Sequence, residues 1–227
     1  MTPIKLTPLY VTTQNHGAEF VEPGGWRLAK SYGPLEQELV TARERVGLAD
    51  VSPHGKLFIE GASVLEAVRA TFASAPENVG SGLKVEAGHL YRLRPDQFYL
   101  STPVGGEAQA NAQLEAVIAA HNLFVTVTNQ THGLADLRLI GPASRAVLSK
   151  VCGLNLADEV FPNLSVRQTS MAKIKQMIVR RDFGSLPTFT LIGAQSLAAY
   201  LWNVILGAGH EFGIAPIGVA ALRELES

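Results

Sequence analysis

The chain has 227 residues, and its nineteen basic and twenty acidic side chains give a net charge of −1. This balance argues against a nucleic-acid-binding protein, which needs a basic surface for phosphates. Hydrophobic residues make up 47% and charged residues only 17%, yet no apolar run reaches the ~18 residues of a membrane span. We therefore expect no membrane association, a cytoplasmic location, and a surface partly covered by another protein or subunit.

The first half of the chain alternates between extended and helical patterns. Residues 9–12 indicate a short extended piece, and Pro34 opens a helix whose apolar side chains fall on one face. Residues 74–88 contain Pro76 and three glycines, which indicates a loop. The other expected elements are a strand at 56–60, a helix capped by Ser63, a hairpin of 89–93 with 97–101, and a helix at 107–121.

The stretch from Arg43 to Gly61 is the most informative one. Gly47 is expected to end the preceding helix with a positive φ, and Ser52-Pro53-His54-Gly55 indicates a turn before a half-buried strand. A polar turn between two buried segments is a common wall of a ligand site. His54 projects from this turn and is a candidate binding residue; the alternative is a connection without function.

The second half predicts further strands and helices. They are strands at 123–128, 134–140, 171–180 and 188–192, a loop at 153–165, and helices at 143–151, 194–212 and 219–226. The long helix at 194–212 is apolar on more than one face. Such a helix is either buried centrally between two units or covered by another protein, which includes a second copy of this chain.

Two segments repeat the same order of features. Leu57–Val68 and Leu137–Leu148 both contain a strand, a glycine and an apolar helix. Each is followed by further short strands and a helix, so we expect an α+β fold of two duplicated, pseudo-symmetric units, at about 1–122 and 123–227. A parallel α/β sheet fits less well because the connections between strands are short.

Motifs for common cofactors are lacking. The sequence contains no dinucleotide-binding glycine motif, no P-loop and no zinc-protease motif. Cys152 is the only cysteine, which excludes an internal disulfide and a cysteine-built metal site. Arg180-Arg181-Asp182 could bind a carboxylate through a guanidinium fork, and the alternative is a solvated surface cluster.

Several motifs in fixed order resemble the glycine-cleavage aminomethyltransferase, or T-protein, family. They are TPLY (7–10), GGW (24–26), VGLADVS (46–52), KLFIEG (56–61), LRLIGPAS (137–144) and LWNVILGAGHEFGIAPIG (201–218). Together they cover nearly the whole chain. The segment FPNLSVRQTSMAKI (161–174) is more similar to the gamma subunit of heterotetrameric sarcosine oxidase, a shorter relative.

The resemblance implies an α+β fold of duplicated ferredoxin-like units with a tetrahydrofolate pocket. The chain ends about where the family's C-terminal barrel begins, so no barrel is expected. The family's folate-pocket turn matches Ser52 and His54, and the strand beside its catalytic aspartate matches Tyr91. We add Arg180 as the fourth candidate pocket residue. Partners implied by the resemblance are larger oxidase-like subunits, with self-association as the alternative.

Three side chains that the family uses have no counterpart at the matching positions. The segment before Tyr91 lacks an aspartate, the turn at 182–190 lacks a glutamate, and Ala220-Ala221 replaces an arginine and an aspartate. The expected function is therefore a folate-binding accessory subunit without catalysis. The alternative is an active one-carbon transferase whose carboxylate has moved to Glu86 or Asp182.

Overall fold

The structure, a computed structural model, describes residues 3–227 and divides into two compact units. The first unit combines the chain up to Ser52 with Ala135–Asn163 and Gln168–Ser227. The second unit consists of Pro53–Leu134 and Leu164–Arg167. The units therefore do not follow the boundary near residue 122 that the sequence suggested, because the chain leaves the first unit after Ser52 and returns to it at Ala135.

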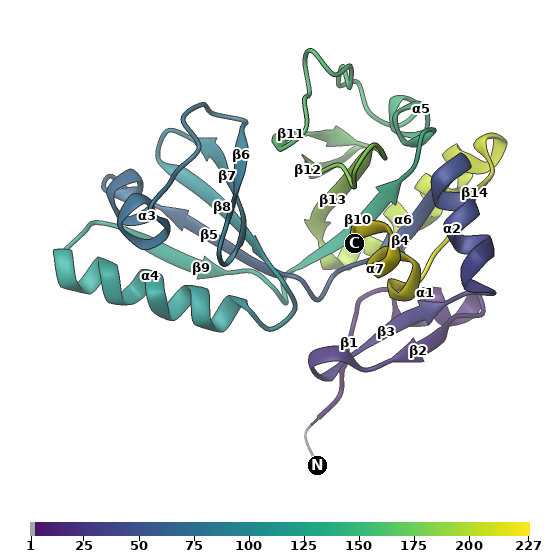
Figure 1. Ribbon diagram of the computed structural model, residues 1–227, viewed down its shortest axis with the longest axis horizontal. Coiled ribbons are helices and arrows are strands. Elements are labelled where there is room, and N and C mark those ends of the chain that lie inside the picture. The colour runs from purple at the N-terminus through teal and green to yellow at the C-terminus, as the bar shows by residue number, and fades with distance from the viewer. Residues whose placement is uncertain (1–2) are drawn as a thin grey trace. The chain divides into compact units, whose positions relative to one another are not determined.

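The second unit is built on an antiparallel sheet with the strand order β6-β7-β8-β5-β9 (Figure 1). Two helices pack on one of its faces through a core that includes Leu57, Phe98 and Leu114. The hairpin and the helix at 107–121 are confirmed. The elements of this unit are β5 (Gly55–Glu60), α3 (Val64–Phe72), β6 (Gly82–Val85), β7 (Gly88–Arg94), β8 (Gln97–Thr102), α4 (Glu107–His121) and β9 (Thr126–Asn129).

The first unit contains a larger sheet with the order β11-β12-β13-β10-β4-β14 (Figure 1). Its strands are β4 (Val46–Asp50), β10 (Leu134–Ile140), β11 (Ser165–Met171), β12 (Ile174–Arg180), β13 (Thr188–Ala194) and β14 (Ile214–Pro216). Leu139 packs in one core with α5 (Ser144–Ser149) and α6 (Ala198–Gly209), and Ile140 in another core with α2 (Leu35–Glu44) and α7 (Val219–Glu226). Since neighbouring residues of a strand point to opposite faces, helices cover both faces of this sheet.

A small sheet with the order β1-β3-β2 completes the first unit. Its strands are β1 (Lys5–Leu6), β2 (Glu19–Val21) and β3 (Trp26–Ser31), and α1 (Tyr10–Asn15) precedes β2. The prediction of an extended piece at 9–12 is therefore wrong. The Thr13 backbone N–H donates to Leu9 O at 2.8 Å, and this helical hydrogen bond outweighs the β-propensity of the threonines.

The six-stranded and the five-stranded sheet each contain one strand from the other half of the sequence. β4, from the first half, pairs with β10, and β9, from the second half, pairs with β5. The registers are equivalent, because Leu137 lies opposite Asp50 and Leu57 lies opposite Asn129. The two repeated segments therefore begin in different sheets with antiparallel central pairs, which agrees with duplication and excludes a single parallel α/β sheet.

Three further expectations need correction. Gly47 does not end a helix but lies inside β4, where a Cβ atom would be 2.6 Å from the side chain of Ile217. Close packing explains this glycine, and its φ is not positive. The loop expected at 74–88 contains β6, and part of the loop at 153–165 and the segment after it form β11.

The long helix has one buried face rather than being apolar all round. Leu201, Trp202 and Ile205 are buried, whereas Asn203 and Gly207 are exposed. Tyr200 is 47% exposed, and its hydroxyl donates to Ala172 O at 3.0 Å. The helix itself therefore does not require a second protein to cover it. Within the described residues, no helix combines the length and the apolar character needed to cross a membrane.

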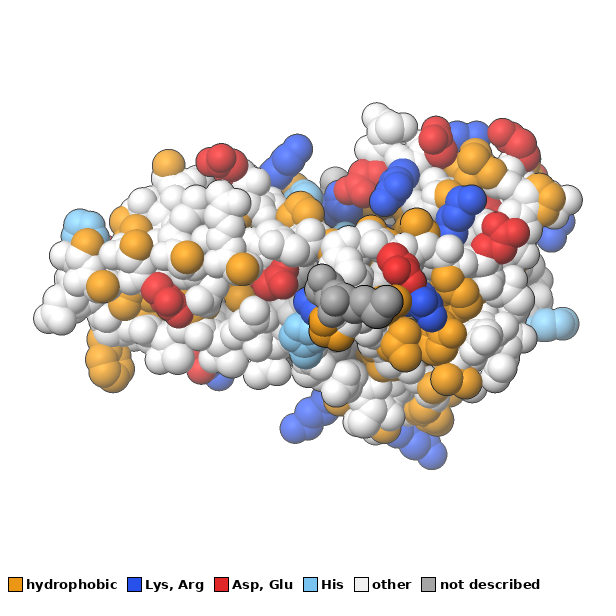
Figure 2. Space-filling view, turned by 90° about the horizontal axis from the view of Figure 1, so that it is seen from below, with side chains coloured by type: hydrophobic (Ala, Val, Ile, Leu, Met, Phe, Trp, Pro, Cys, Tyr) orange, Lys and Arg blue, Asp and Glu red, His pale blue; other side chains and the backbone are white. Residues whose placement is uncertain are grey.

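Charged side chains on the surface are mixed in sign. Figure 2 shows basic and acidic side chains interspersed on the visible face. Several of them form ion pairs, such as Arg27 with Glu22 at 2.6 Å and Lys150 with Glu211 at 2.8 Å. Because these pairs are solvent-exposed, each contributes roughly 0–1 kcal/mol to the free energy of unfolding.

Candidate functional site

Ser52 ends β4 in a turn that Asp50 closes. The backbone N–H and the hydroxyl of Ser52 both donate to Asp50 Oδ1, over 3.0 and 2.6 Å. The hydroxyl oxygen also accepts from the Asp136 N–H at 3.2 Å, and only 2% of Ser52 is exposed. These bonds hold the end of β4 against β10, so Ser52 has a structural task in the first unit. A contact with folate stays a prediction.

Thr131 repeats this turn in the second unit. Its backbone N–H donates to Asn129 Oδ1 at 2.9 Å, and its hydroxyl oxygen accepts from the Lys56 N–H at 3.0 Å. Thr131 is as buried as Ser52, with 2% exposed. The two turns are equivalent because each terminates the exchanged strand of its sheet through the same pair of hydrogen bonds.

His54 follows the first of these turns and belongs to the second unit. It is half-buried, and its carbonyl oxygen accepts from Lys56 Nζ at 2.9 Å. Lys56 is completely buried, which is rare for a lysine. The sequence pattern did not predict the burial of Lys56, although a lysine that begins the apolar run Leu57–Ile59 is a signal that could have identified it.

Tyr91 lies in a row of aromatic side chains across three strands. Its ring is stacked with Tyr99 at a centroid distance of 6.2 Å, and Tyr99 contacts Phe58 at 5.3 Å. The three residues are cross-strand neighbours on β7, β8 and β5. Because Leu57, Leu90 and Leu100 point to the helices, this aromatic row lies on the opposite face of the sheet.

The aromatic row is mostly closed to solvent. Tyr91 is 1% and Tyr99 0% exposed, whereas Phe58 is half-buried. Neither α3 nor α4 shares the face of the aromatic row, so within its own unit this face carries no helix. Phe58 is the one ring of this row that is partly open to solvent, so a planar ring that stacks on the row would meet Phe58.

Arg180 is an internal ion-pair centre in the first unit. Its side chain is 6% exposed, and its Nε and Nη2 donate to Asp182 over distances of 2.6–3.1 Å. Nη1 donates to Asp158 and to Phe161 O. Hydrogen bonding to Asp182 is the main cause that raises the pKa of Arg180, and hydrogen bonding to Arg180 lowers the pKa of the Asp158 carboxyl.

The two carboxylates considered as relocated catalytic groups have different surroundings. Asp182 is 13% exposed, holds Arg180 with both oxygens, and accepts from the Thr188 N–H at 3.1 Å. Glu86 is exposed in the turn between β6 and β7, beside a cavity of about 220 Å³ lined in part by Pro103 and Gln113. Neither carboxylate lies in a closed site with an unused oxygen pair.

The four predicted residues are divided between the units. Ser52 and Arg180 belong to the first unit, and His54 and Tyr91 to the second. Within the second unit, the chain connects His54 to the aromatic row through β5, since His54 directly precedes Gly55 and the strand that carries Phe58. We therefore treat the aromatic row and His54 as the candidate site.

Glu38 is a buried acidic residue of the first unit that the sequence pattern did not reveal. Glu38 is 5% exposed and accepts from the Tyr32 N–H at 2.5 Å and the Gly218 N–H at 2.7 Å. Burial, followed by the charges of Asp50 and Glu38, raises the pKa of the Tyr32 phenol. In the sequence Glu38 belongs to a run of mixed charges on a helix, and nothing in that run distinguishes it from a solvated residue.

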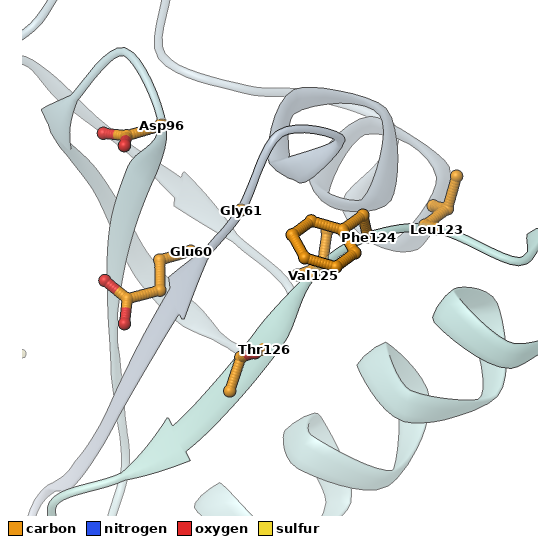
Figure 3. A pocket seen from close by; sticks show the side chains of 7 residues that line it. All are labelled: Glu60, Gly61, Asp96, Leu123, Phe124, Val125 and Thr126. Carbon is orange, nitrogen blue, oxygen red and sulfur yellow. The ribbon is translucent and has the colours of Figure 1, made fainter.

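A cavity of about 370 Å³ opens at the end of β5 (Figure 3). Its lining residues are Glu60, Gly61, Asp96, Leu123, Phe124, Val125 and Thr126. Figure 3 shows the Glu60 and Asp96 carboxylates on one side of Gly61 and the Phe124 ring on the other. Arg94 links the carboxylates, with Nε 3.2 Å from Asp96 and Nη2 3.6 Å from Glu60. The described residues contain no group of three or more potential metal ligands.

The fold is that of an aminomethyltransferase T-protein domain. Residues 9–226 match the family model of the GCVT N-terminal domain, and the chain belongs to this family. The aminomethyltransferase of Shouchella clausii is 29% identical over 97% of this chain and 62% of its own length. The sarcosine oxidase alpha subunit of Corynebacterium sp. (strain P-1) is 26% identical over all of this chain and 26% of its own length.

Solved structures confirm the expected fold. Aminomethyltransferase T of the glycine cleavage system from Bartonella henselae superimposes with a TM-score of 0.82 and 25% identity over 98% of this chain and 62% of that one. A chain of heterotetrameric sarcosine oxidase from Corynebacterium sp. U-96 gives a TM-score of 0.67 and 22% identity over 80% of this chain and 93% of that one. This chain thus spans about a quarter of the alpha subunits and less than two thirds of the aminomethyltransferases that it matches.

Proposed function

We propose that this chain is a folate-binding accessory subunit of an enzyme of one-carbon or methylamine metabolism, without aminomethyl transfer of its own. The observation that supports this most is the engagement of Asp182 by Arg180. Transfer of a one-carbon unit from an amine to folate needs a carboxylate that can orient a cationic amine in a closed site. A carboxylate already neutralised by a guanidinium is unsuited to that task.

The candidate site fits tetrahydrofolate in part. The aromatic row offers a stacking surface for a pterin ring through its half-buried member, Phe58. His54, next to β5, supplies a hydrogen-bonding side chain. The turn at 182–190 offers only Asp182, which holds Arg180, so a carboxylate acceptor for the pterin amide edge is missing there. We therefore propose weak binding, with a Kd of roughly 10–100 μM.

An active transferase is the second candidate. The matches to proteins named aminomethyltransferase extend over almost the whole chain, and this observation favours it. In that case Glu86 would supply the carboxylate, because it is exposed and does not share the ion pair of Asp182.

Two measurements on the purified chain separate these candidates. Calorimetric titration with tetrahydrofolate, and with folinic acid as a stable analogue, should show saturable binding. Phe58→Ala should raise the Kd about tenfold, while the control Phe124→Ala, in the same unit but outside the aromatic row, should leave it unchanged. An assay of aminomethyl transfer should show no turnover. Turnover that Glu86→Gln abolishes, with an unchanged melting temperature, would establish the second candidate.

We propose larger oxidase-like subunits as the partners rather than a second copy of this chain. The supporting observation is the likeness to a chain of a heterotetrameric sarcosine oxidase. Light scattering should therefore show a monomer at tens of micromolar. A stable homodimer at that concentration would contradict this choice of partner.

A further inference from the structure

The two sheets differ at the outer edge of the exchanged strand. In the first unit, β14 pairs in parallel with β4, with Ile214 opposite Val46 and Pro216 opposite Leu48. In the second unit, β9 is the last strand of the sheet, and no described strand lies beyond it. Since β4 and β9 have equivalent registers with their inner neighbours, the place that β14 fills in the first unit holds no described strand in the second.

The backbone of β9 is oriented to accept a strand. Gln130 N–H donates to Lys56 O at 2.8 Å, so residue 130 and, by alternation, residues 128 and 126 face β5. The N–H and C=O groups of Val127 and Asn129 therefore point away from the sheet. In the first unit Leu48 has the position equivalent to Val127, and its carbonyl accepts from the Ile217 N–H at 2.9 Å.

Phe124, two residues before β9, also lacks the cover that its counterpart Arg45 has. Arg45 and Phe124 are equivalent because their carbonyls accept from the Ala143 N–H at 3.1 Å and the Ser63 N–H at 3.4 Å. Arg45 packs on the residue before β14, since a Cβ on Gly213 would be 2.7 Å from Arg45 Cδ. Phe124 is 80% exposed, so its ring is accessible to a bound segment.

Natural edge strands usually carry a charge, a proline or a bulge that prevents pairing with other chains. The strand Thr126-Val127-Thr128-Asn129 carries no charge and no proline, and its pairing with β5 is regular. At the start of this strand lies the cavity of Figure 3, where two carboxylates share the single guanidinium of Arg94 and leave a net negative charge.

We infer that the outer edge of β9 binds an extended segment of a partner protein, added in parallel as β14 is added to β4. The segment carries a small apolar core of the Ile-Ala type opposite Val125 to Val127. A lysine or arginine at its N-terminal end enters the cavity and meets Glu60, Asp96 and the ring of Phe124. This interaction surface is independent of the folate site, because it lies at the edge of the sheet and not on the aromatic row.

A synthetic peptide tests the inference on the full chain. The probe is the acetylated peptide Lys-Gly-Ile-Ala-Val-Ile-Gly, which follows residues 213–218 with valine in place of Pro216 and a lysine in front. Nuclear magnetic resonance should show a Kd of about 1 mM or lower, with slowed hydrogen exchange at the Val127 and Asn129 amides. The same peptide with glutamate in place of lysine should bind at least threefold more weakly.

Two variants give the matched comparison. Val127→Pro removes an outward N–H and no bond to β5, so it should weaken binding at least tenfold, whereas Val127→Ala should change it less than threefold. If Val127→Pro does not fold, Glu60→Gln combined with Asp96→Asn should remove the preference for the lysine peptide. Absence of amide protection at millimolar peptide, or equal binding by the proline variant, would overturn the inference.

A second copy of the chain is the competing occupant. It would pair antiparallel around a two-fold axis, and the Val127 and Asn129 amides would become protected as the concentration of the chain alone rises, together with a doubling of the mass. That result would show that a second copy of the chain, and not a segment of a partner protein, occupies the edge of β9.

Discussion

The second unit differs from the first in what covers its sheet. The first unit covers both faces of its sheet with helices and closes the edge at β4 with β14. The second unit places α3 and α4 on one face only and leaves the edge of β9 open. The hydrogen bonds that end β4 and β9 are nevertheless the same. A common scaffold has thus been kept where strands end, whereas faces and edges, which can bind other molecules, have diverged.

The glycines after β5 and β10 give the most severe test of this equivalence. Gly61 and Gly141 have φ values of +147° and +125°, and an added Cβ would lie 2.2 Å from Phe124 O and 2.5 Å from Arg45 O, respectively. Gly61→Ala and Gly141→Ala should each lower the free energy of unfolding by roughly 2–4 kcal/mol. Urea unfolding followed by circular dichroism measures this.

The control is Gly105→Ala, which has a φ of +83° and nothing within 4 Å of the added atom. It should cost only about 1 kcal/mol. If only one of the variants Gly61→Ala and Gly141→Ala is more destabilised than the control, the connections after β5 and β10 are not equivalent.

Glu38 is a buried carboxylate of the first unit, and its hydrogen bonds can be tested by substitution. Its carboxylate accepts from Tyr32 and from Gly218, the residue that precedes α7. Glu38→Gln keeps the shape, but its NH2 group cannot accept, so one of the two bonds is lost and the other is weakened. The variant should therefore cost roughly 1–3 kcal/mol. Thermal unfolding measures this loss. Glu36→Gln, an exposed neighbour on the same helix, is the control and should be nearly neutral.

Ser52→Ala and Thr131→Ala compare the two strand-ending turns directly. Each removes a buried hydroxyl that accepts a backbone N–H, and each should lower the free energy of unfolding by roughly 1–2 kcal/mol. Chemical denaturation of the two variants should give similar losses. A loss of folate affinity in Ser52→Ala at unchanged stability would instead support the predicted pocket role of Ser52.

Asp158→Asn should have the smallest effect on stability, and the pH dependence of this effect should appear only at acidic pH. Its folded pKa is below the ordinary value of 3.8, mainly through Arg180, so its ion pair is formed above the unfolded pKa and is lost as pH falls through the lower folded pKa. The difference in melting temperature between wild type and Asp158→Asn should be constant above about pH 5 and should shrink below about pH 4. A difference that grows on acidification would contradict the assigned sign.

Local patterns sufficed for several elements and for the duplication. The hairpin around Arg94-Pro95-Asp96, α4 and α7 follow from turn residues and periodicity, which act over a few neighbouring residues. The equivalence of Leu57–Val68 and Leu137–Leu148 was also readable, because both segments begin with the same strand, glycine and helix. The family followed from motifs in fixed order.

The sequence predicted only part of the candidate site. Tyr91 was selected through the resemblance, but its neighbours Tyr99 and Phe58 were not, because cross-strand contacts join residues far apart in the sequence. Arg180 was selected as a carboxylate binder, and the structure shows which carboxylates it holds, Asp158 and Asp182. Two arginines and an aspartate in a row do not reveal this pairing.

The sequence by itself determined the family, the α+β class and most of the helices, since these depend on local periodicity and ordered motifs. Only the tertiary structure decided that β4 and β9 are exchanged between the halves, that Gly47 lies in a strand, and that β14 closes one edge while β9 stays open. Strand pairing is a choice among distant partners with similar local patterns. It is settled by the packing of whole faces, such as Gly47 against Ile217, and no short stretch of sequence contains that information.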